Sequence, residues 1–109
     1  MRIIVIEDGR AFIQVTRESK FFDDIASYIG DCIEELAQED HTVILSTCDA
    51  QLIGCKFTCE ISLADNTTVP IWGNAVFVGC DPSGLYESLT EAEIRAWLMR
   101  LQAALSEPD

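Results

Sequence analysis

The chain has 109 residues, of which 49% are hydrophobic, and its formal net charge is -12. This length is typical of one domain, residues 1–109, and the hydrophobic content is that of a folded protein rather than of a disordered acidic tail. The negative field repels nucleic acid and anionic membranes and attracts basic surfaces, so direct binding to nucleic acid or to a membrane is not expected.

The N-terminus predicts a cytoplasmic protein. Its apolar run is short, residues 3–6, and acidic residues follow where a signal peptide would carry its cleavage site. Elsewhere no apolar run approaches the roughly 18 residues that a membrane span needs.

The first predicted element is a β-hairpin. The first strand is predicted over residues 2–6, of which residues 3–6 are β-branched and apolar, and residues 11–16 form the returning strand. Between them stands Asp8-Gly9, a pair that favours the tight turn in which both central residues have positive φ.

Residues 19–39 are predicted to form a helix. Apolar residues recur there at helical spacing, from Phe22 to Leu36, and acidic residues occupy the opposite side. Asp23 and Asp24 fall in the first turns, where negative charge suits the helix dipole. Gly30 lies inside this segment and indicates either close packing on a sheet or a break between two shorter helices.

The middle of the chain predicts further strands separated by turns. The predicted strands cover residues 41–48, 52–63, 68–72 and 75–79. Pro70 confines its strand to an edge or a strand end, because proline cannot donate to the ladder.

The last predicted element is a helix that begins at Thr90. Thr90-Glu91-Ala92-Glu93 fits a capping box, an apolar stripe follows, and the helix is expected to end before Pro108. The whole order predicts an α+β fold: a mostly antiparallel sheet of about five to six strands with two helices packed on one face.

Five cysteines, at positions 32, 48, 55, 59 and 80, call for an explanation. An odd count argues against a closed disulfide framework, and the chain has no paired CxxC motif for zinc. Reduced cysteines that act as small buried hydrophobic residues are the main prediction. A reactive thiol, or a cysteine at an oligomer interface, is the alternative.

Three segments carry a family resemblance: the opening strand with its Asp8-Gly9 turn, residues 28–34, and residues 71–81 followed by 88–93. Together they resemble small proteins of phages and mobile elements described as domain of unknown function 3846. Residues 55–63 depart from that family's pattern, which has a polar Pro-Asn segment there. The resemblance implies an origin in a mobile element, and it brings no catalytic motif.

The residues themselves do not predict an enzyme, a cofactor or a metal site. His41 is the only histidine and follows two acidic residues at a predicted junction, so a surface or capping role is expected for it. Residues 79–84 contain glycines, but they lack the lysine and the following helix of a phosphate-binding loop.

The first hypothesis is therefore a binding protein that acts through its acidic surface. Eight of the 19 acidic residues lie between Glu18 and Asp40, against one base. On a helix they would form a negative ridge that resembles a row of DNA phosphates and blocks a basic groove of a host defence or nucleic-acid-handling protein. The predicted partner-binding residues are Asp24, Asp31, Glu34, Glu35 and Glu39.

The second hypothesis is a homo-oligomer that sequesters a small signalling ligand of nucleotide type in pockets between identical copies. An anionic ligand would need local arginines to overcome the negative field, together with aromatic and polar groups from turns and edge strands. The predicted ligand-binding residues are Arg10, Arg17, Trp72, Asn74 and Tyr86.

Overall fold

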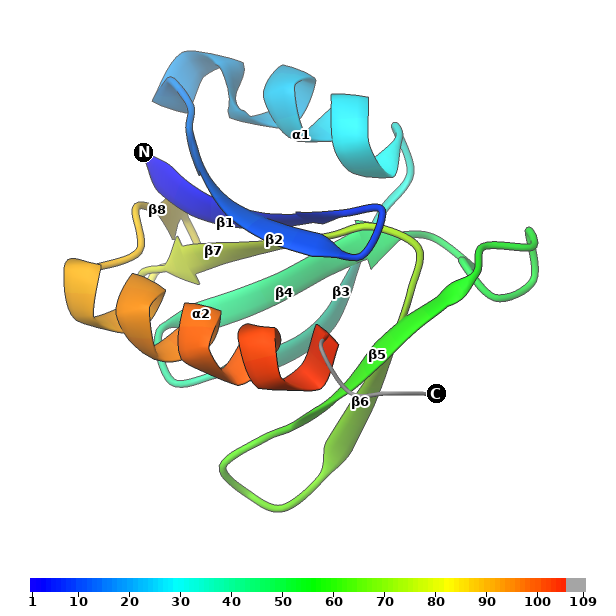
Figure 1. Cartoon of the computed structure of the whole chain (residues 1–109). Coiled ribbons are helices and arrows are strands. Elements are labelled where there is room, and N and C mark those ends of the chain that lie inside the picture. The colour runs from blue at the N-terminus through cyan, green and yellow to red at the C-terminus, as the bar shows by residue number, and fades with distance from the viewer. Residues whose placement is uncertain (106–109) are drawn as a thin grey trace.

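A computed structural model describes residues 1–105, which form a six-stranded antiparallel sheet, a two-stranded sheet and two α-helices (Figure 1). The strands of the main sheet are β1 (Arg2–Glu7), β2 (Arg10–Val15), β3 (Ile33–Glu39), β4 (Thr42–Thr47), β7 (Ala75–Cys80) and β8 (Tyr86–Glu87). Their order is β2-β1-β7-β4-β3, and β8 pairs with the end of β7. The predicted α+β class and antiparallel sheet are confirmed.

A smaller antiparallel sheet projects from the main one. It consists of β5 (Phe57–Ser62) and β6 (Thr68–Trp72), which lie beside the red end of the C-terminal helix in Figure 1. The strand predicted over residues 52–63 begins only at Phe57, because residues 49–54 turn back on themselves. The backbone N–H groups of Ile53 and Cys55 donate to the carbonyls of Asp49 and Ala50.

The two helices cover opposite faces of the main sheet. Helix α1 (Phe21–Ile29), which follows the 3₁₀ turn η1 (Glu18–Lys20), lies on one face, and α2 (Glu91–Leu105) lies on the other (Figure 1). The prediction that both helices pack on one face is wrong. The central strands β1, β4 and β7 are buried on both sides, so each face of the sheet is covered by a helix.

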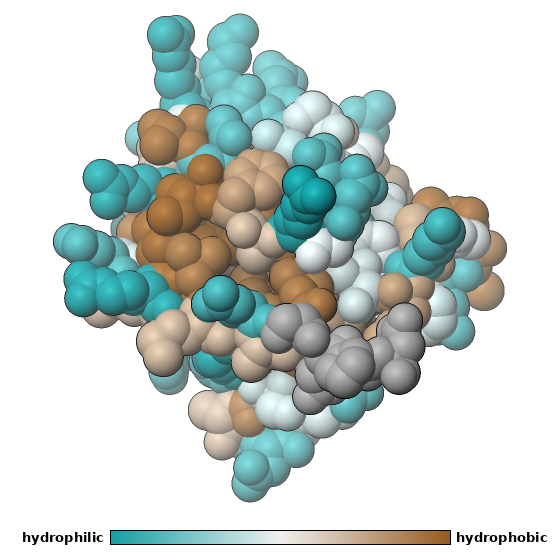
Figure 2. Space-filling view, in the orientation of Figure 1, coloured by the Kyte–Doolittle hydropathy of each residue, from teal (hydrophilic) through white to brown (hydrophobic). Residues whose placement is uncertain are grey.

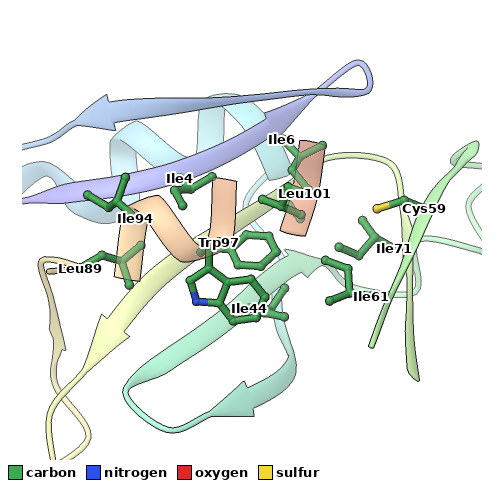
Figure 3. Close-up of a cluster of buried hydrophobic side chains, with 12 residues drawn as sticks. Ile4, Ile6, Ile44, Cys59, Ile61, Ile71, Leu89, Ile94, Trp97 and Leu101 are labelled. Atoms are coloured by element: carbon green, nitrogen blue, oxygen red, sulfur yellow. The ribbon is translucent and has the colours of Figure 1, made fainter. Parts of the chain in front are cut away.

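Successive residues of the central strands feed two separate cores. Figure 3 shows the core under α2, where Trp97 and Leu101 pack on Ile4, Ile6 and Ile44. The core under α1 is built from Phe21, Ile25, Ile29, Ile3, Val5, Val43, Leu45, Val76 and Val78. Alternate side chains of a strand point to opposite faces, which is why a continuous apolar run serves both cores.

The helix predicted over residues 19–39 is wrong beyond Ile29. Gly30, with φ of 84°, ends α1, and residues 33–39 form the edge strand β3. Asp40 takes a φ of 51° in the turn that brings β3 back along β4. Pairing with β4 therefore overrides the local helical pattern of this segment.

The expectation of five reduced cysteines is also wrong for two of them. Cys32 and Cys48 form a disulfide, with their Cα atoms 5.4 Å apart. Ile33 pairs with Thr47 in the β3–β4 register, so Cys32, which directly precedes β3, lies opposite Cys48, which directly follows β4. Cys55, Cys59 and Cys80 are free thiols.

The capping box of α2 is confirmed by its bonds. The backbone N–H of Thr90 donates to Glu93 Oε1 at 2.8 Å, and the N–H of Glu93 donates to Thr90 Oγ1 at 3.1 Å. The predicted helix end before Pro108 lies outside the described residues. Within residues 1–105, no helix has both the length and the apolar character to cross a membrane.

Candidate functional site

A hollow of about 440 Å³ lies between β3, the end of β4, the loop that follows it, and β6. Its polar wall contains Glu34, Ser46, Asp49 and the Trp72 indole. These residues come from four separate segments, so the hollow exists only in the folded chain. We refer to it below as the acidic pocket.

The register of the sheet places the carboxylate and the hydroxyl of this pocket together. Glu34 lies directly opposite Ser46 in the antiparallel pairing of β3 with β4, so both side chains project from the same face. The backbone N–H of Asp49 donates to Glu34 Oε2 at 3.4 Å, which brings the turn after β4 to the pocket wall. The Cys32–Cys48 disulfide holds the residue before Asp49 against β3.

Ser46 is the buried polar residue of this pocket. Its side chain is 1% exposed, and its hydroxyl has no hydrogen-bond partner among residues 1–105. Leaving a buried hydroxyl unpaired costs about 1–3 kcal/mol, and in folded proteins such a group is usually paired with a protein group, an ordered water or a ligand. Ser46 is also one of the residues that line the acidic pocket, so an occupant that reaches its hydroxyl would supply the missing hydrogen bond.

Trp72 adds an aromatic wall to this acidic pocket. The indole is half-buried and packs edge-to-face on Phe57, with ring centroids 5.3 Å apart and an interplanar angle of 73°. Carboxylates, a hydroxyl and an indole together suit a cation with several N–H donors, above all a guanidinium group. An anion would meet Glu34 and Asp49 at the entrance and be repelled.

The five residues predicted to form an acidic helical ridge do not share a helix. Asp24 lies on α1 and accepts a hydrogen bond from Thr16 Oγ1, whereas Asp31 lies in the loop after α1. Glu34 and Glu35 are exposed neighbours on β3 and point to opposite faces of the strand.

Glu39 is the member of that set that a cation neutralises. Arg100 Nη1 donates to its carboxylate at 2.6 Å, and this bond holds the pKa of Glu39 below its usual range. Of the predicted partner-binding residues, Glu34 alone lines the acidic pocket. The helical ridge is thus replaced by an acidic strand edge.

The alternative ligand set is not assembled within one copy of the chain. Arg10 and Arg17 lie at and just beyond opposite ends of β2, and Tyr86 packs on Phe21. The side-chain amide of Asn74 is used inside the fold: its Oδ1 accepts from the Asp8 N–H at 3.1 Å and its Nδ2 donates to the Tyr28 carbonyl at 2.9 Å. Only Trp72 of this set lines the acidic pocket.

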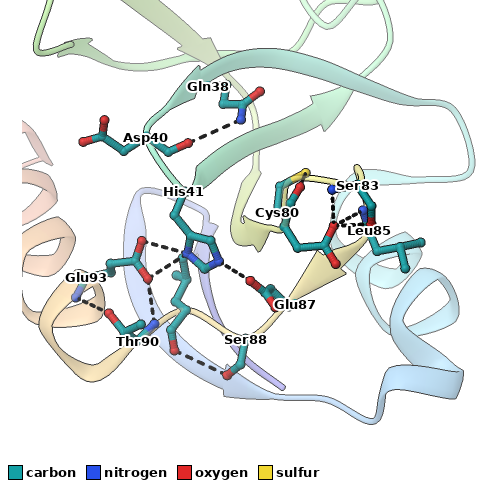
Figure 4. Close-up of polar contacts among 12 residues, drawn as sticks. Gln38, Asp40, His41, Cys80, Ser83, Leu85, Glu87, Ser88, Thr90 and Glu93 are labelled. Carbon is teal, nitrogen blue, oxygen red and sulfur yellow. Dashed lines mark hydrogen bonds and ion pairs between the residues drawn. The ribbon is translucent and has the colours of Figure 1, made fainter.

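His41 sits in a second polar cluster, between two carboxylates (Figure 4). Its Nδ1 lies 2.9 Å from both carboxylate oxygens of Glu93, and its Nε2 lies 2.6 Å from Glu87 Oε1. The hydrogen bond to Glu87, followed by that to Glu93, raises the pKa of His41. The doubly protonated imidazolium satisfies both carboxylates at once, so the ring ties the β3–β4 turn to β8 and to the start of α2.

Gly79 makes room for this histidine. A Cβ built at Gly79 would lie 2.4 Å from His41 Cε1 and 2.8 Å from the Glu87 carbonyl oxygen. Any larger residue would therefore displace the imidazole from its carboxylates. The sequence predicted a surface or capping role for His41, and the structure gives it a half-buried position against Glu93, the glutamate of the α2 capping box.

We expect stability to fall as the pH rises through the folded-state pKa of His41. The raised pKa means that the imidazolium contributes stability in full below its unfolded value, near 6.5, and loses that contribution above the folded value. Because one proton is involved, the free energy of unfolding should change by at most about 1.4 kcal/mol per pH unit. Urea unfolding across this pH range measures it, and His41→Gln should flatten the dependence while Gln38→Ala, on the neighbouring strand, leaves it intact.

Glu93 gives the same cluster an acidic limit. Its pKa is lowered, with the hydrogen bonds from Thr90 and His41 outweighing its burial. The contribution of the Glu93 carboxylate to stability is present above its unfolded-state pKa of 4.5. It is lost as the pH falls through the lower pKa of the folded state. If the His41→Gln variant kept the wild-type pH profile, the imidazolium would not be tied to these carboxylates.

Comparison with known proteins assigns the chain to a family and goes no further. No curated protein and no solved structure matches it. Within residues 1–105, no group of three or more His, Cys, Asp or Glu side chains is placed to hold a metal ion. A family model matches residues 1–102, which confirms the family resemblance and includes its three segments: the opening strand with Asp8-Gly9, residues 28–34, and residues 71–81 followed by 88–93. The chain belongs to the family described as Domain of unknown function (DUF3846).

Proposed function

We propose that the chain is a non-catalytic binding protein that recognises a basic segment of another protein, with an arginine side chain in the acidic pocket. The observation that carries the proposal is the unpartnered, buried hydroxyl of Ser46 in a hollow walled by Glu34, Asp49 and Trp72. A guanidinium group would pair with the carboxylates, donate to the hydroxyl and lie against the indole.

The surface around the pocket favours the same class of partner. From Phe21 to Cys55 the chain has eight acidic residues and neither lysine nor arginine. Asp31, Glu34 and Glu35 are exposed along or beside the β3 edge. A continuous negative edge attracts a basic segment and raises its association rate, and the pocket then selects the side chain that fits.

A host protein that handles nucleic acid is the proposed partner class, because such proteins carry basic surfaces. Occupying such a surface would inhibit its owner, and the mobile-element origin that the family resemblance implies is part of the same proposal. Mimicry of a regular phosphate row is not part of the proposal, since Asp24, Asp31 and Glu35 do not lie on one helix.

Catalysis is left out of the proposal for a chemical reason. Both ring nitrogens of His41 face carboxylates, so neither is free to take a proton from a nucleophile. The nearest free thiol along the sheet, Cys80, has its pKa raised by burial and by nearby acidic groups, first among them Asp81. A raised pKa keeps the thiol protonated and weakly nucleophilic.

Fluorescence anisotropy of a labelled arginine-glycine repeat peptide tests the proposal. Glu34→Gln with Asp49→Asn should weaken binding at least tenfold, because charge-assisted hydrogen bonds contribute about 1.5–3 kcal/mol each. The matched control is Glu18→Gln with Asp23→Asn, which removes the same charge from η1 and α1. An equal loss of peptide affinity in both double variants would show that general charge attraction accounts for the binding, and would contradict the proposed arginine site in the acidic pocket.

Ser46→Ala tests the pocket independently of general charge attraction, because it changes no charge. Removing the unpaired hydroxyl should leave the free protein as stable as before or more stable, since the buried group has no partner to lose among residues 1–105. The same substitution should weaken peptide binding. A variant that loses stability and keeps its affinity would show that the hydroxyl serves the fold alone.

A further inference from the structure

The two edges of the main sheet differ in how they meet solvent. At one edge lies β3, and at the other lies β2, which among residues 1–105 pairs only with β1. We propose that a second copy of this chain pairs with the free edge of β2, antiparallel, so that the two main sheets become one across a twofold axis. Four observations support this interface.

The backbone of β2 is set for such pairing. Thr16 and Met1 exchange both of their hydrogen bonds, N–H to carbonyl in each direction. In an antiparallel ladder these reciprocal pairs recur at every second residue, so the backbone groups of residues 10, 12, 14 and 16 point to β1. Ala11, Ile13 and Val15 therefore direct their N–H and carbonyl groups outward.

The same three residues present apolar side chains. Ile13 is 47% exposed and Val15 is 68% exposed, and both lie on the α2 side of the strand, opposite Ile4 and Arg2 of β1. An open groove of about 540 Å³ continues from Ala11 to Leu98 of α2. Figure 2 shows the hydrophobic surface gathered over this region, ringed by polar side chains.

Charge permits contact between copies at this edge. Each copy carries -12, so two copies repel unless they meet where acidic residues are missing. Residues 10–17 contain two arginines and no acid. In the antiparallel arrangement Arg17 of one copy lies opposite Gly9 of the other, which is flanked by Asp8 and Arg10, and no two acidic residues face each other along residues 10–16.

The opposite edge of the sheet, β3, carries the charged side chains that commonly keep an edge strand from pairing with another chain. Charged side chains on an edge strand discourage edge-to-edge association. Glu34 and Glu35 are exposed on β3, so pairing two β3 edges would bring four carboxylates close together. β2 has no comparable protection along residues 11–15.

One register satisfies all of these constraints. When Ile13 faces Ile13 of the second copy, Ala11 faces Val15 on both sides of the axis. The three pairs formed by Ala11, Ile13 and Val15 then use outward-pointing backbone groups, and each of these pairs exchanges two hydrogen bonds. The apolar side chains of both copies meet on one face of the joined sheet, because directly opposite residues share a face.

Sedimentation equilibrium of the full chain tests the interface. The wild type should have the mass of a dimer. Ile13→Lys should shift it to a monomer, because the lysine at the twofold axis would face the lysine of the second copy and the two charges would repel. Leu52→Lys is the matched control: Leu52 is 84% exposed and lies after β4, away from the β2 edge, so the dimer should persist. A monomeric wild type, or a dimeric Ile13→Lys variant, would overturn the proposal.

Cross-linking identifies the edge even if a lysine variant folds poorly. In a background with Cys55→Ser and Cys80→Ser, an Ile13→Cys variant should give a covalent dimer with a short bis-maleimide, since facing Cα atoms lie about 5.5 Å apart. Leu52→Cys in the same background should stay monomeric on a denaturing gel. The reverse pattern would place the contact at another surface and reject the β2 edge.

Discussion

Trp97→Ala is expected to destabilise the protein by about 3–5 kcal/mol, which is a large part of the total stability of a domain of this size. Trp97 is 3% exposed and packs edge-to-face on Phe77, with centroids 4.9 Å apart. Its Nε1–H donates to Thr42 Oγ1 at 2.9 Å, and Arg100 lies 4.0 Å from its ring centroid. Alanine removes all three contacts, opens a cavity and leaves the buried Thr42 hydroxyl unpaired.

Urea unfolding monitored by circular dichroism measures this loss. Met99→Ala is the matched control, because Met99 is on the same helix and 71% exposed, and its replacement should change the free energy of unfolding by less than about 0.5 kcal/mol. Trp97→Phe should fall between the two, since it keeps ring packing and loses the bond to Thr42. A Trp97→Ala variant as stable as Met99→Ala would contradict the packing of α2 on the sheet.

The elements predicted correctly from the sequence are those whose signals are local. Asp8 and Gly9 take φ angles of 51° and 80°, the conformation that this pair favours wherever it occurs. Thr90 and Glu93 bond each other's backbone within one turn. Neither feature depends on a distant partner, so neighbouring residues are enough to specify both.

The sequence predicts a helix over residues 33–39 because a β-bulge interrupts the alternation typical of a strand. The register between β3 and β4 shifts between Glu35 and Ala37, and Leu36 and Ala37 both pack toward the core under α2. Two adjacent residues on one face break the period of two, and the remaining spacing imitates a helix. Only the pairing with β4, which is long-range information, identifies the strand.

The candidate site was predicted in fragments. Glu34 and Trp72 were both singled out, but for different ligands, because nothing in the sequence shows that β3 and β6 border one hollow. Ser46 had no signal: a serine in an apolar strand is ordinary, and its unpaired hydroxyl becomes visible only when every neighbour is in place. The odd number of cysteines argues against a complete disulfide framework, but it allows one disulfide beside three free thiols.

Reduction of the Cys32–Cys48 disulfide is expected to destabilise the protein by about 3 kcal/mol. The two cysteines are 16 residues apart, and closing a loop of this size removes that much conformational entropy from the unfolded chain. Urea unfolding with and without dithiothreitol measures the difference. Cys32→Ser with Cys48→Ser should match the reduced protein and become insensitive to the reagent.

The disulfide also connects stability to the proposed pocket. Cys48 directly precedes Asp49, whose backbone N–H reaches Glu34, so releasing Cys48 frees one wall of the acidic pocket. Reduction should therefore weaken binding of the arginine-glycine peptide under conditions in which circular dichroism shows the protein still folded. Cys59→Ser, a change at a buried thiol of β5, serves as the control for altered cysteine content. If reduced, folded protein bound the peptide as tightly as the oxidised form, the disulfide would stabilise the β3–β4 hairpin without shaping the site.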